Sequence, residues 1–303
     1  LRAVVIALFE QLINGLTQGS VYALLALGFT VIFGTLRMVT FAHGEVFMVG
    51  AYIGLSLFTY FSPNFFFALV IVLLATFILG AVMEIVAFRF LRDAPHFSSL
   101  LVTIGISILL INVAQLIWGP GTRAVPPAII EDLAYSEIEF NGIYVTYLQL
   151  AVLGVAIALM VAMYLFMERT KIGMAIRATA QDHEAAFAMG VNVNRVFTFT
   201  FAIGSMMGGV AGLLVGLYYN VFFPTMGTLL GLKAFSASVV GGLSSLPGAV
   251  VAGLIIGVVE SFAVEVWDAG VRHMVSFLFM IVVLIARPAG LFGKKELIKA
   301  RGD

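Results

Sequence analysis

The sequence predicts an all-α, polytopic integral membrane protein. Hydrophobic residues make up 62% of the 303 residues and charged residues only 11%, whereas soluble domains are about half apolar and about a quarter charged. Charge is therefore too scarce to cover a soluble surface of this size. A spanning helix needs about 20 mainly apolar residues, and several apolar runs in the chain reach that length.

Apolar segments at nine places in the chain are candidates for the spanning helices. They are Phe9–Phe33, Val39–Phe61, Phe65–Phe90, Ser98–Trp118, Tyr147–Met167, Val196–Asn220, Thr228–Gly241, Leu246–Val264 and His273–Ala286. The run Thr228–Gly241 is short and flanked by glycine. Irregular backbone is tolerated at membrane depth only where protein or water covers it. We therefore expect eight or nine crossings, depending on whether Thr228–Gly241 crosses or re-enters, in a single transmembrane domain over residues 1–303.

The distribution of basic residues predicts the orientation. Cytoplasmic loops of membrane proteins carry an excess of lysine and arginine. If nine segments alternate, one side receives most of the basic residues: Arg37, Arg89, Arg92, Arg169, Lys171, Arg177, Arg195, Arg287, Lys294, Lys295, Lys299 and Arg301. The other side receives Arg2, Arg123 and Arg272, and Lys233 lies within a segment. We therefore expect the N-terminus outside and the C-terminal tail in the cytoplasm.

Composition and motifs exclude several function classes. The net charge is zero and cysteine is absent, so neither nucleic-acid binding nor a thiolate metal site is expected. The histidines are scattered and fit no metal-ligand spacing. The phosphate loop Gly-x-x-x-x-Gly-Lys-Ser/Thr is missing. Gly242-Leu-Ser-Ser245 lacks the final glycine of a serine-protease turn. We expect no cofactor, no metal and no catalytic activity in this chain, with a membrane-embedded hydrolase as a disfavoured alternative.

Glycines recur every fourth residue in one segment and so line one helix face: Gly204, Gly208, Gly212 and Gly216. In lipid, helices associate by close backbone approach, which small residues permit. The pattern predicts tight helix packing. A surface along which helices slide during gating is an alternative, and the two are compatible.

The connection between residues 168 and 195 is predicted to contain a short capped helix. Asp182 is a good N-cap, Glu184 suits the positive end of a helix, and Gly190 is a natural stop. The helix consists largely of alanines with small side chains, so the large side chains of Phe187 and Met189 are expected to project from it. One interpretation is an apolar knob that fits a groove in a partner protein. The alternative is a helix that lies on the membrane surface.

Polar residues inside membrane segments are costly and are functional candidates. The densest group lies in the stretch Thr40–Glu45, which comprises Thr40, Phe41, His43, Gly44 and Glu45. We predict that this stretch contributes to a gate or a polar pathway. His43 and Glu45 are two residues apart, so on a regular helix their side chains point in different directions. Glu84 and Glu260 lie near segment ends, where an interfacial or interhelical role is expected.

Motifs in order along nearly the whole chain resemble a known family, the permeases of branched-chain amino acid ABC importers, specifically the H-type (LivH-like) subunit. Thr40–Tyr52 resembles the first-half signature of the family, and Glu184–Gly190 resembles the EAA loop of ABC permeases. Ala234–Gly242, Pro247–Gly253 and Glu260-Ser261 resemble the second-half signature. Arg287–Gly293 resembles the family's C-terminal ending. Two departures are Thr40 in place of the usual asparagine and the absence of Ile-x-Leu-Pro after Gly190.

The resemblance implies partners and site residues. The partners are two ATP-binding cassette ATPase subunits, a second permease subunit (M-type, or a second copy) and a periplasmic solute-binding protein. The location is the cytoplasmic (inner) membrane of a bacterium or archaeon. The loop 168–195 is then the coupling element, with these residues as its candidates: Gly173, Arg177, Asp182, Glu184, Ala185, Ala186, Phe187 and Gly190.

The predicted function is transport of a small polar solute, driven by the partner ATPases. Branched-chain or other hydrophobic amino acids are the first expectation, and urea, short amides and organic acids are alternatives within the same importer class. A stand-alone secondary transporter is a second class. It would need ion-coordinating broken helices or a buried charge relay, whereas the sequence shows only scattered acids.

Overall fold

The structure is a computed structural model that describes residues 2–61, 64–92, 96–126, 136–140 and 142–293. Helices dominate these residues. The helices long and apolar enough to span a membrane number 7 in the described part of the chain. They are α1 (Arg2–Leu36), α2 (Ala42–Phe61), α3 (Phe65–Val86), α4 (His96–Trp118), α6 (Tyr147–Arg169), α9 (Val193–Tyr219) and α11 (Leu246–Val266). Together they confirm the predicted polytopic all-α membrane fold.

Two further predicted segments form shorter apolar helices, α10 (Met226–Gly241) and α12 (Arg272–Ala286). All nine predicted segments are therefore helical. Helix α10 lies among α1, α2, α11 and α12. Because these helices surround it, little of its backbone faces lipid. A segment too short to span the bilayer is tolerated at membrane depth where protein covers it, and the neighbours of α10 provide that cover.

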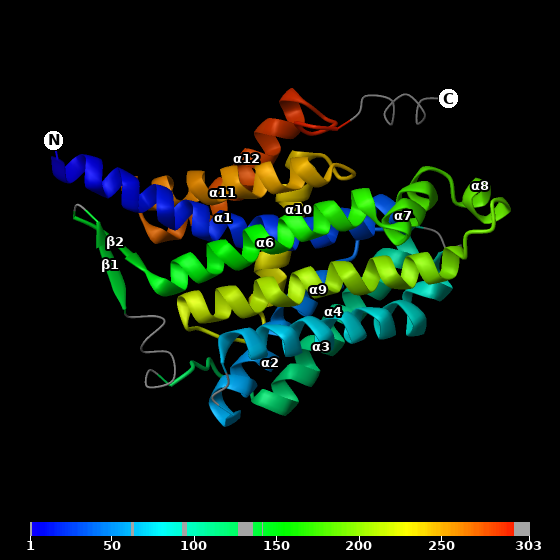
Figure 1. The fold of residues 1–303 in the computed structure, drawn as a ribbon, viewed down its shortest axis with the longest axis horizontal. Coiled ribbons are helices and arrows are strands. Elements are labelled where there is room, and N and C mark those ends of the chain that lie inside the picture. Colours follow the sequence, from blue (N-terminus) through cyan, green and yellow to red (C-terminus); the bar gives the residue numbers. More distant parts are fainter. Residues whose placement is uncertain (1, 62–63, 93–95, 127–135, 141, 294–303) are drawn as a thin grey trace.

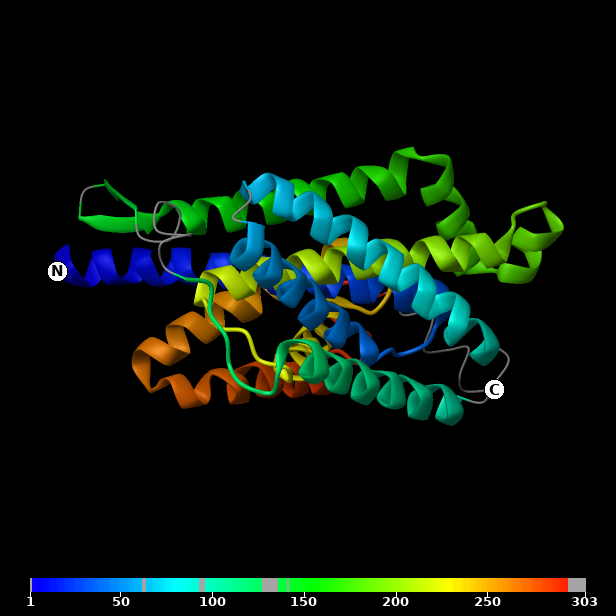
Figure 2. The same cartoon turned by 90° about the horizontal axis from the view of Figure 1, so that it is seen from below.

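The two ends of the bundle carry different accessory elements (Figures 1 and 2). The N-terminal end of α1 lies beside an antiparallel hairpin of β1 (Glu137–Phe140) and β2 (Ile143–Thr146). The opposite end carries α7 (Lys171–Gln181) and α8 (His183–Ala188). Short 3₁₀ turns follow α3 at Phe88–Leu91 and precede α12 at Ala269–Val271. The hairpin and α7 were not predicted. The two strands have only 4 residues each, too few for a distinct period, whereas α7 is clearly amphipathic over its 11 residues and was missed.

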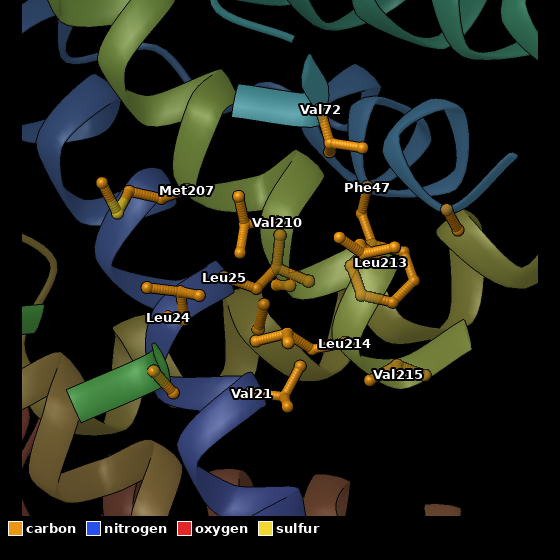
Figure 3. Packing of buried hydrophobic residues seen from close by; sticks show 14 of the residues in the cluster. Val21, Leu24, Leu25, Phe47, Val72, Met207, Val210, Leu213, Leu214 and Val215 are labelled. Carbon is orange, nitrogen blue, oxygen red and sulfur yellow. The ribbon is translucent and has the colours of Figure 1, made fainter. Parts of the chain in front are cut away.

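The core forms where α1, α2, α3 and α9 meet. Figure 3 shows Leu25 of α1, Phe47 of α2 and Val72 of α3 pointing toward Val210 and Leu213 of α9. Helix α9 is the central element. In its most apolar stretch of 18 residues, 94% of the residues are buried, against 11% in the corresponding stretch of α4. Helices α3 and α4 therefore leave broad apolar faces for lipid or for another membrane protein.

Three glycines of the α9 repeat lie where this helix meets α1 and α2, and the fourth, Gly216, packs against the Phe222 ring. All four members of the repeat are buried. A Cβ atom at Gly212 would overlap the carbonyl oxygen of Phe47 in α2, and one at Gly204 would lie 2.8 Å from the carbonyl oxygen of Gly28 in α1. A Cβ atom at Gly50 of α2 would overlap the backbone of Gly209, and one at Gly209 would overlap the side chain of Thr76 in α3. The backbones approach so closely that these positions have no room for a side chain.

Alanine at Gly212 is expected to destabilise the protein, whereas alanine at Gly154 is not. Overpacking costs about 1–3 kcal/mol or more, which exceeds the ~1 kcal/mol gained by replacing a helical glycine. Gly154 of α6 is the matched control, because nothing lies within 4 Å of a Cβ there. Thermal unfolding of the two purified variants in detergent measures the difference. Equal stability of both would show that α9 can move away from Phe47 at no cost.

Candidate functional site

A cavity of about 340 Å³ lies between α1, α2, α4 and α10. Its walls are mainly apolar, formed by these side chains: Phe29, Phe41, Ile104, Ile108, Ile111 and Leu232. Three polar side chains also line it: Glu45 of α2, Ser107 of α4 and Thr228 of α10. Small-molecule sites in proteins combine such apolar walls with a few placed polar groups.

Glu45 is the centre of the polar group. Its carboxylate is fully buried, and Oε1 accepts hydrogen bonds from the hydroxyls of Thr228 at 2.8 Å and Ser107 at 3.1 Å. The second oxygen, Oε2, is buried and accepts no hydrogen bond. Thr228, Ile104 and Ile108 are exposed in the isolated chain, so the cavity is open on that side.

The side chains of the predicted cluster at Thr40–Glu45 do not all face the cavity. Phe41 and Glu45 line the cavity, while Thr40 is buried outside it. His43 packs edge-on against the Phe29 ring, with centroids 5.4 Å apart. His43 and Glu45 thus point in different directions, as their spacing predicts. Gly44 does not break α2.

Gly44 instead brings α2 against α10. A Cβ atom at Gly44 would overlap the carbonyl oxygen of Gly227 and lie 3.0 Å from the Cα of Gly231. This close approach places Glu45, the next residue in α2, within hydrogen-bond reach of Thr228, the residue after Gly227. The small residues of α2 and α10 therefore form one wall of the cavity.

A second polar cluster is fully buried between α1, α10, α11 and α12. Lys233 of α10 forms an ion pair with Glu260 of α11, with Nζ 2.7 Å from Oε1 and 2.9 Å from Oε2. Tyr22 of α1 donates to Oε2 of Glu260 at 2.9 Å, and Gln18 donates at 3.0 Å. Ser276 of α12 donates to Oε1. The interhelical role expected of Glu260 is confirmed, but its pairing with Lys233 was not foreseen.

Glu84 is also interhelical, as expected. Its buried carboxylate pairs with Arg92 and Arg89 and accepts a hydrogen bond from Thr198 of α9 at 2.5 Å. Arg92 in turn bonds the side chain of Asn194. The cluster ties the end of α3 to the beginning of α9, close to α8 along the chain.

The connection after α6 folds into two successive helices. Thr170 ends α6 and caps α7, because its hydroxyl accepts the backbone N–H of Gly173 at 3.0 Å. Gly173 packs against the backbone of Phe166 and Met167, so the turn has no room for a side chain there. Arg177 pairs with Glu168 across the turn.

Helix α8 has the predicted N-cap. The carboxylate of Asp182 accepts the backbone N–H groups of Glu184 and Ala185, each at 2.9 Å. These hydrogen bonds, chiefly the one from the backbone N–H of Ala185, lower the pKa of Asp182 below its usual value. The capping carboxylate is therefore ionised at neutral pH.

Gly190 ends α8 at a φ of +87°, in the left-handed region. Ala186 is buried, while the side chains of Phe187 and Met189 are 72% and 86% exposed. The structure thus confirms a short capped helix (Figure 1). Its two exposed apolar side chains are those predicted from the sequence.

These features define a multi-pass membrane protein with a polar group inside an apolar-walled cavity. Residues 11–285 match the family described as "Branched-chain amino acid transport system / permease component", and the chain belongs to that family. The resemblance stated from the motifs is therefore confirmed.

Curated relatives span almost the whole chain. The high-affinity branched-chain amino acid transport system permease protein BraD of Pseudomonas aeruginosa is 37% identical over 96% of this chain and 97% of the relative. The corresponding protein LivH of Escherichia coli K12 is 34% identical with the same coverage. A probable LivH permease of Methanocaldococcus jannaschii is 27% identical over 92% of this chain and 91% of the relative.

Proposed function

We propose that this chain is the membrane-spanning permease subunit of an ABC importer that carries branched-chain or other apolar amino acids across the inner membrane. The observation that carries the proposal is the cavity beside Glu45, whose apolar walls and polar centre suit a small solute with one polar end. The names of the relatives agree with it. The whole chain would then form one transmembrane domain, with ATP bound and hydrolysed by partner subunits.

The proposed partners correspond to three surfaces. Two ATPase subunits dock at the end of the assembly that carries α7 and α8, where the exposed Phe187 and Met189 provide an apolar contact. A solute-binding protein docks at the opposite end, beside the β1–β2 hairpin. A second permease subunit, of the M-type or a second copy, covers the open side of the cavity near Thr228. The exposed apolar faces of α3 and α4 leave room for such a neighbour in the bilayer.

The distribution of basic groups supports an orientation with α8 in the cytoplasm and the N-terminus outside. Arg37 donates to the carbonyl of Ala180 in α7, and Arg92 bonds Asn194 near α8. The tail lysines and arginine after residue 293 lie outside the described residues. Two arginines lie at the opposite end of α9. Arg272 donates to the hydroxyl of Tyr219, and the backbone of Arg123 pairs with that of Phe222 in the loop after α9. Positive charge is thus concentrated at the α8 end.

A reconstitution tests the function. Vesicles that contain this chain with its partner subunits, with ATP trapped inside and leucine-loaded binding protein outside, should accumulate leucine. Vesicles without this chain, or with ATP only outside, should not. Accumulation by this chain alone would contradict the importer and favour a secondary transporter.

A further inference from the structure

Glu45 is a buried carboxylate whose charge has no partner in the described residues. The ion pairs of the described chain involve the carboxylates of Glu84, Glu168 and Glu260. Glu45 receives only two hydroxyl hydrogen bonds, both on Oε1, and Oε2 is buried without one. Burying an ionised group is costly unless it is paired. The compensating positive charge must come from a proton, from a bound molecule or from the second permease subunit proposed to cover the cavity.

The surroundings of Glu45 favour a cation with an apolar body. Phe29 and Phe41 line the cavity, and each packs against Phe235 behind them, with ring centroids 5.5 and 6.4 Å apart. Isoleucines of α4 form another part of the wall. A strongly hydrated metal ion would find only one carboxylate and two hydroxyls here. An apolar solute that carries a single ammonium group matches both the walls and the unpaired oxygen.

We infer that the cavity is an ammonium-recognition subsite for small apolar amines, including the ammonium end of zwitterionic amino acids. Oε2 of Glu45 has no accessible surface in this conformation, so the carboxylate rotates toward the cavity to accept one ammonium N–H. The hydroxyl oxygens of Ser107 and Thr228 accept others, since a hydroxyl that donates still carries lone pairs. Charge-assisted bonds of this kind are stronger than neutral ones. The subsite selects against anions that lack an amine. Its use during transport rests on the proposed function, but its charge preference does not.

A reporter cysteine in the assembled importer tests the charge preference directly. The chain has no native cysteine, so Ser107→Cys gives a single reactive thiol in the cavity wall. Because the reacting thiolate is itself anionic, the ratio of the two rates is divided by the same ratio for a small free thiol in solution. We expect an ammonium-bearing methanethiosulfonate to react at least tenfold faster than its sulfonate-bearing analogue after this correction. In the Ser107→Cys/Glu45→Gln variant this ratio should fall at least fivefold. A ratio that is the same in both backgrounds would overturn the inference, and Thr228→Cys provides a second reporter if the first does not assemble.

Protection experiments test the apolar body. Isopentylamine is leucine without its carboxyl group, and 4-methylpentanoate is leucine without its amine. Isopentylamine should slow labelling of the reporter cysteine with a neutral thiosulfonate, and 4-methylpentanoate at the same concentration should not. Equal protection by both would show a merely apolar cavity and overturn the inference.

Uptake by the complete importer separates this inference from the proposed function. Glu45→Gln should lower leucine uptake at least tenfold while ATP hydrolysis remains stimulated by loaded binding protein, and Glu45→Asp should restore part of the uptake. Glu265→Gln, at the exposed end of α11, is the matched control and should leave uptake unchanged. If wild-type vesicles do not transport leucine but the labelling ratio depends on Glu45, the subsite stands without the function. If Glu45→Gln transports normally, the function stands without the subsite.

Discussion

Replacing Phe187 by alanine is expected to abolish most ATP-driven uptake while leaving the protein folded. ABC import requires a free-energy link between the ATPases and the permease, and that link must be a contact that differs between two states. Phe187 is 72% exposed on a helix that stands out from the end of the bundle (Figure 2). An exposed large ring of this kind is suited to act as an interface anchor.

The expected size of the effect follows from interface energetics. Truncation of a buried aromatic anchor commonly costs about 2 kcal/mol or more, which is a factor of ~30 in affinity for the ATPase subunits. The same truncation at Tyr164 of α6, which is 52% exposed on the apolar surface, is the matched control. Co-purification of the ATPases and stimulation of their activity by loaded binding protein measure docking and coupling. Wild-type stimulation and uptake in Phe187→Ala would reduce α8 to a surface connector.

Gly190→Val tests the conformation of the same helix by a different route. No atom lies within 4 Å of a Cβ at Gly190, so the substitution causes no clash. Its cost arises from the φ of +87°, which a β-branched residue rarely adopts. We therefore expect α8 to end differently, and stimulation of ATP hydrolysis to fall, while the stability of the membrane bundle stays the same.

Features that depend on local sequence could be predicted. The apolar runs predicted nine helices, of which 7 in the described part of the chain are long enough to span a membrane, because the bilayer sets the length of a spanning helix. The cap at Asp182 and the stop at Gly190 were predictable because each acts within one helical turn. The opposite directions of His43 and Glu45 followed from helical geometry alone.

Features that depend on contacts between distant segments were missed. The partners of Glu45 are Ser107 and Thr228, which lie 62 and 183 residues away along the chain. No local pattern marks a serine or threonine as a partner for a carboxylate. The pairing of Lys233 with Glu260 was missed for the same reason, although an isolated lysine inside an apolar segment is itself a signal that a buried acid must be near.

The Lys233–Glu260 pair is expected to dominate the stability of α10. Both side chains are fully buried. Removal of one member of a buried ion pair costs about 3–5 kcal/mol, because the other charge is left without compensation. Glu260→Gln keeps the shape and leaves the Lys233 ammonium unpaired, so it should lower the unfolding temperature more than any substitution of an exposed acid.

The double variant separates charge compensation from packing. Lys233→Met/Glu260→Gln removes both charges at similar volume, and replacing a whole buried pair is often close to neutral. We expect it to recover most of the stability lost in Glu260→Gln, giving a large coupling energy in the double-mutant cycle. Thermal unfolding of the three variants and the wild type in detergent measures the cycle. Additive losses would show that the two side chains act independently.

The same cycle links stability to the cavity. Lys233 faces the buried network, whereas Thr228 and Leu232 of the same short helix line the cavity beside Glu45. The ion pair therefore fixes which face of α10 is turned toward Glu45. A rotated α10 would move the Thr228 hydroxyl away from its 2.8 Å contact with Glu45. Glu260→Gln should accordingly reduce uptake as well as stability, and the double variant should restore both together. Recovery of stability without recovery of uptake would mean that the charges themselves take part in transport, beyond holding α10 in place.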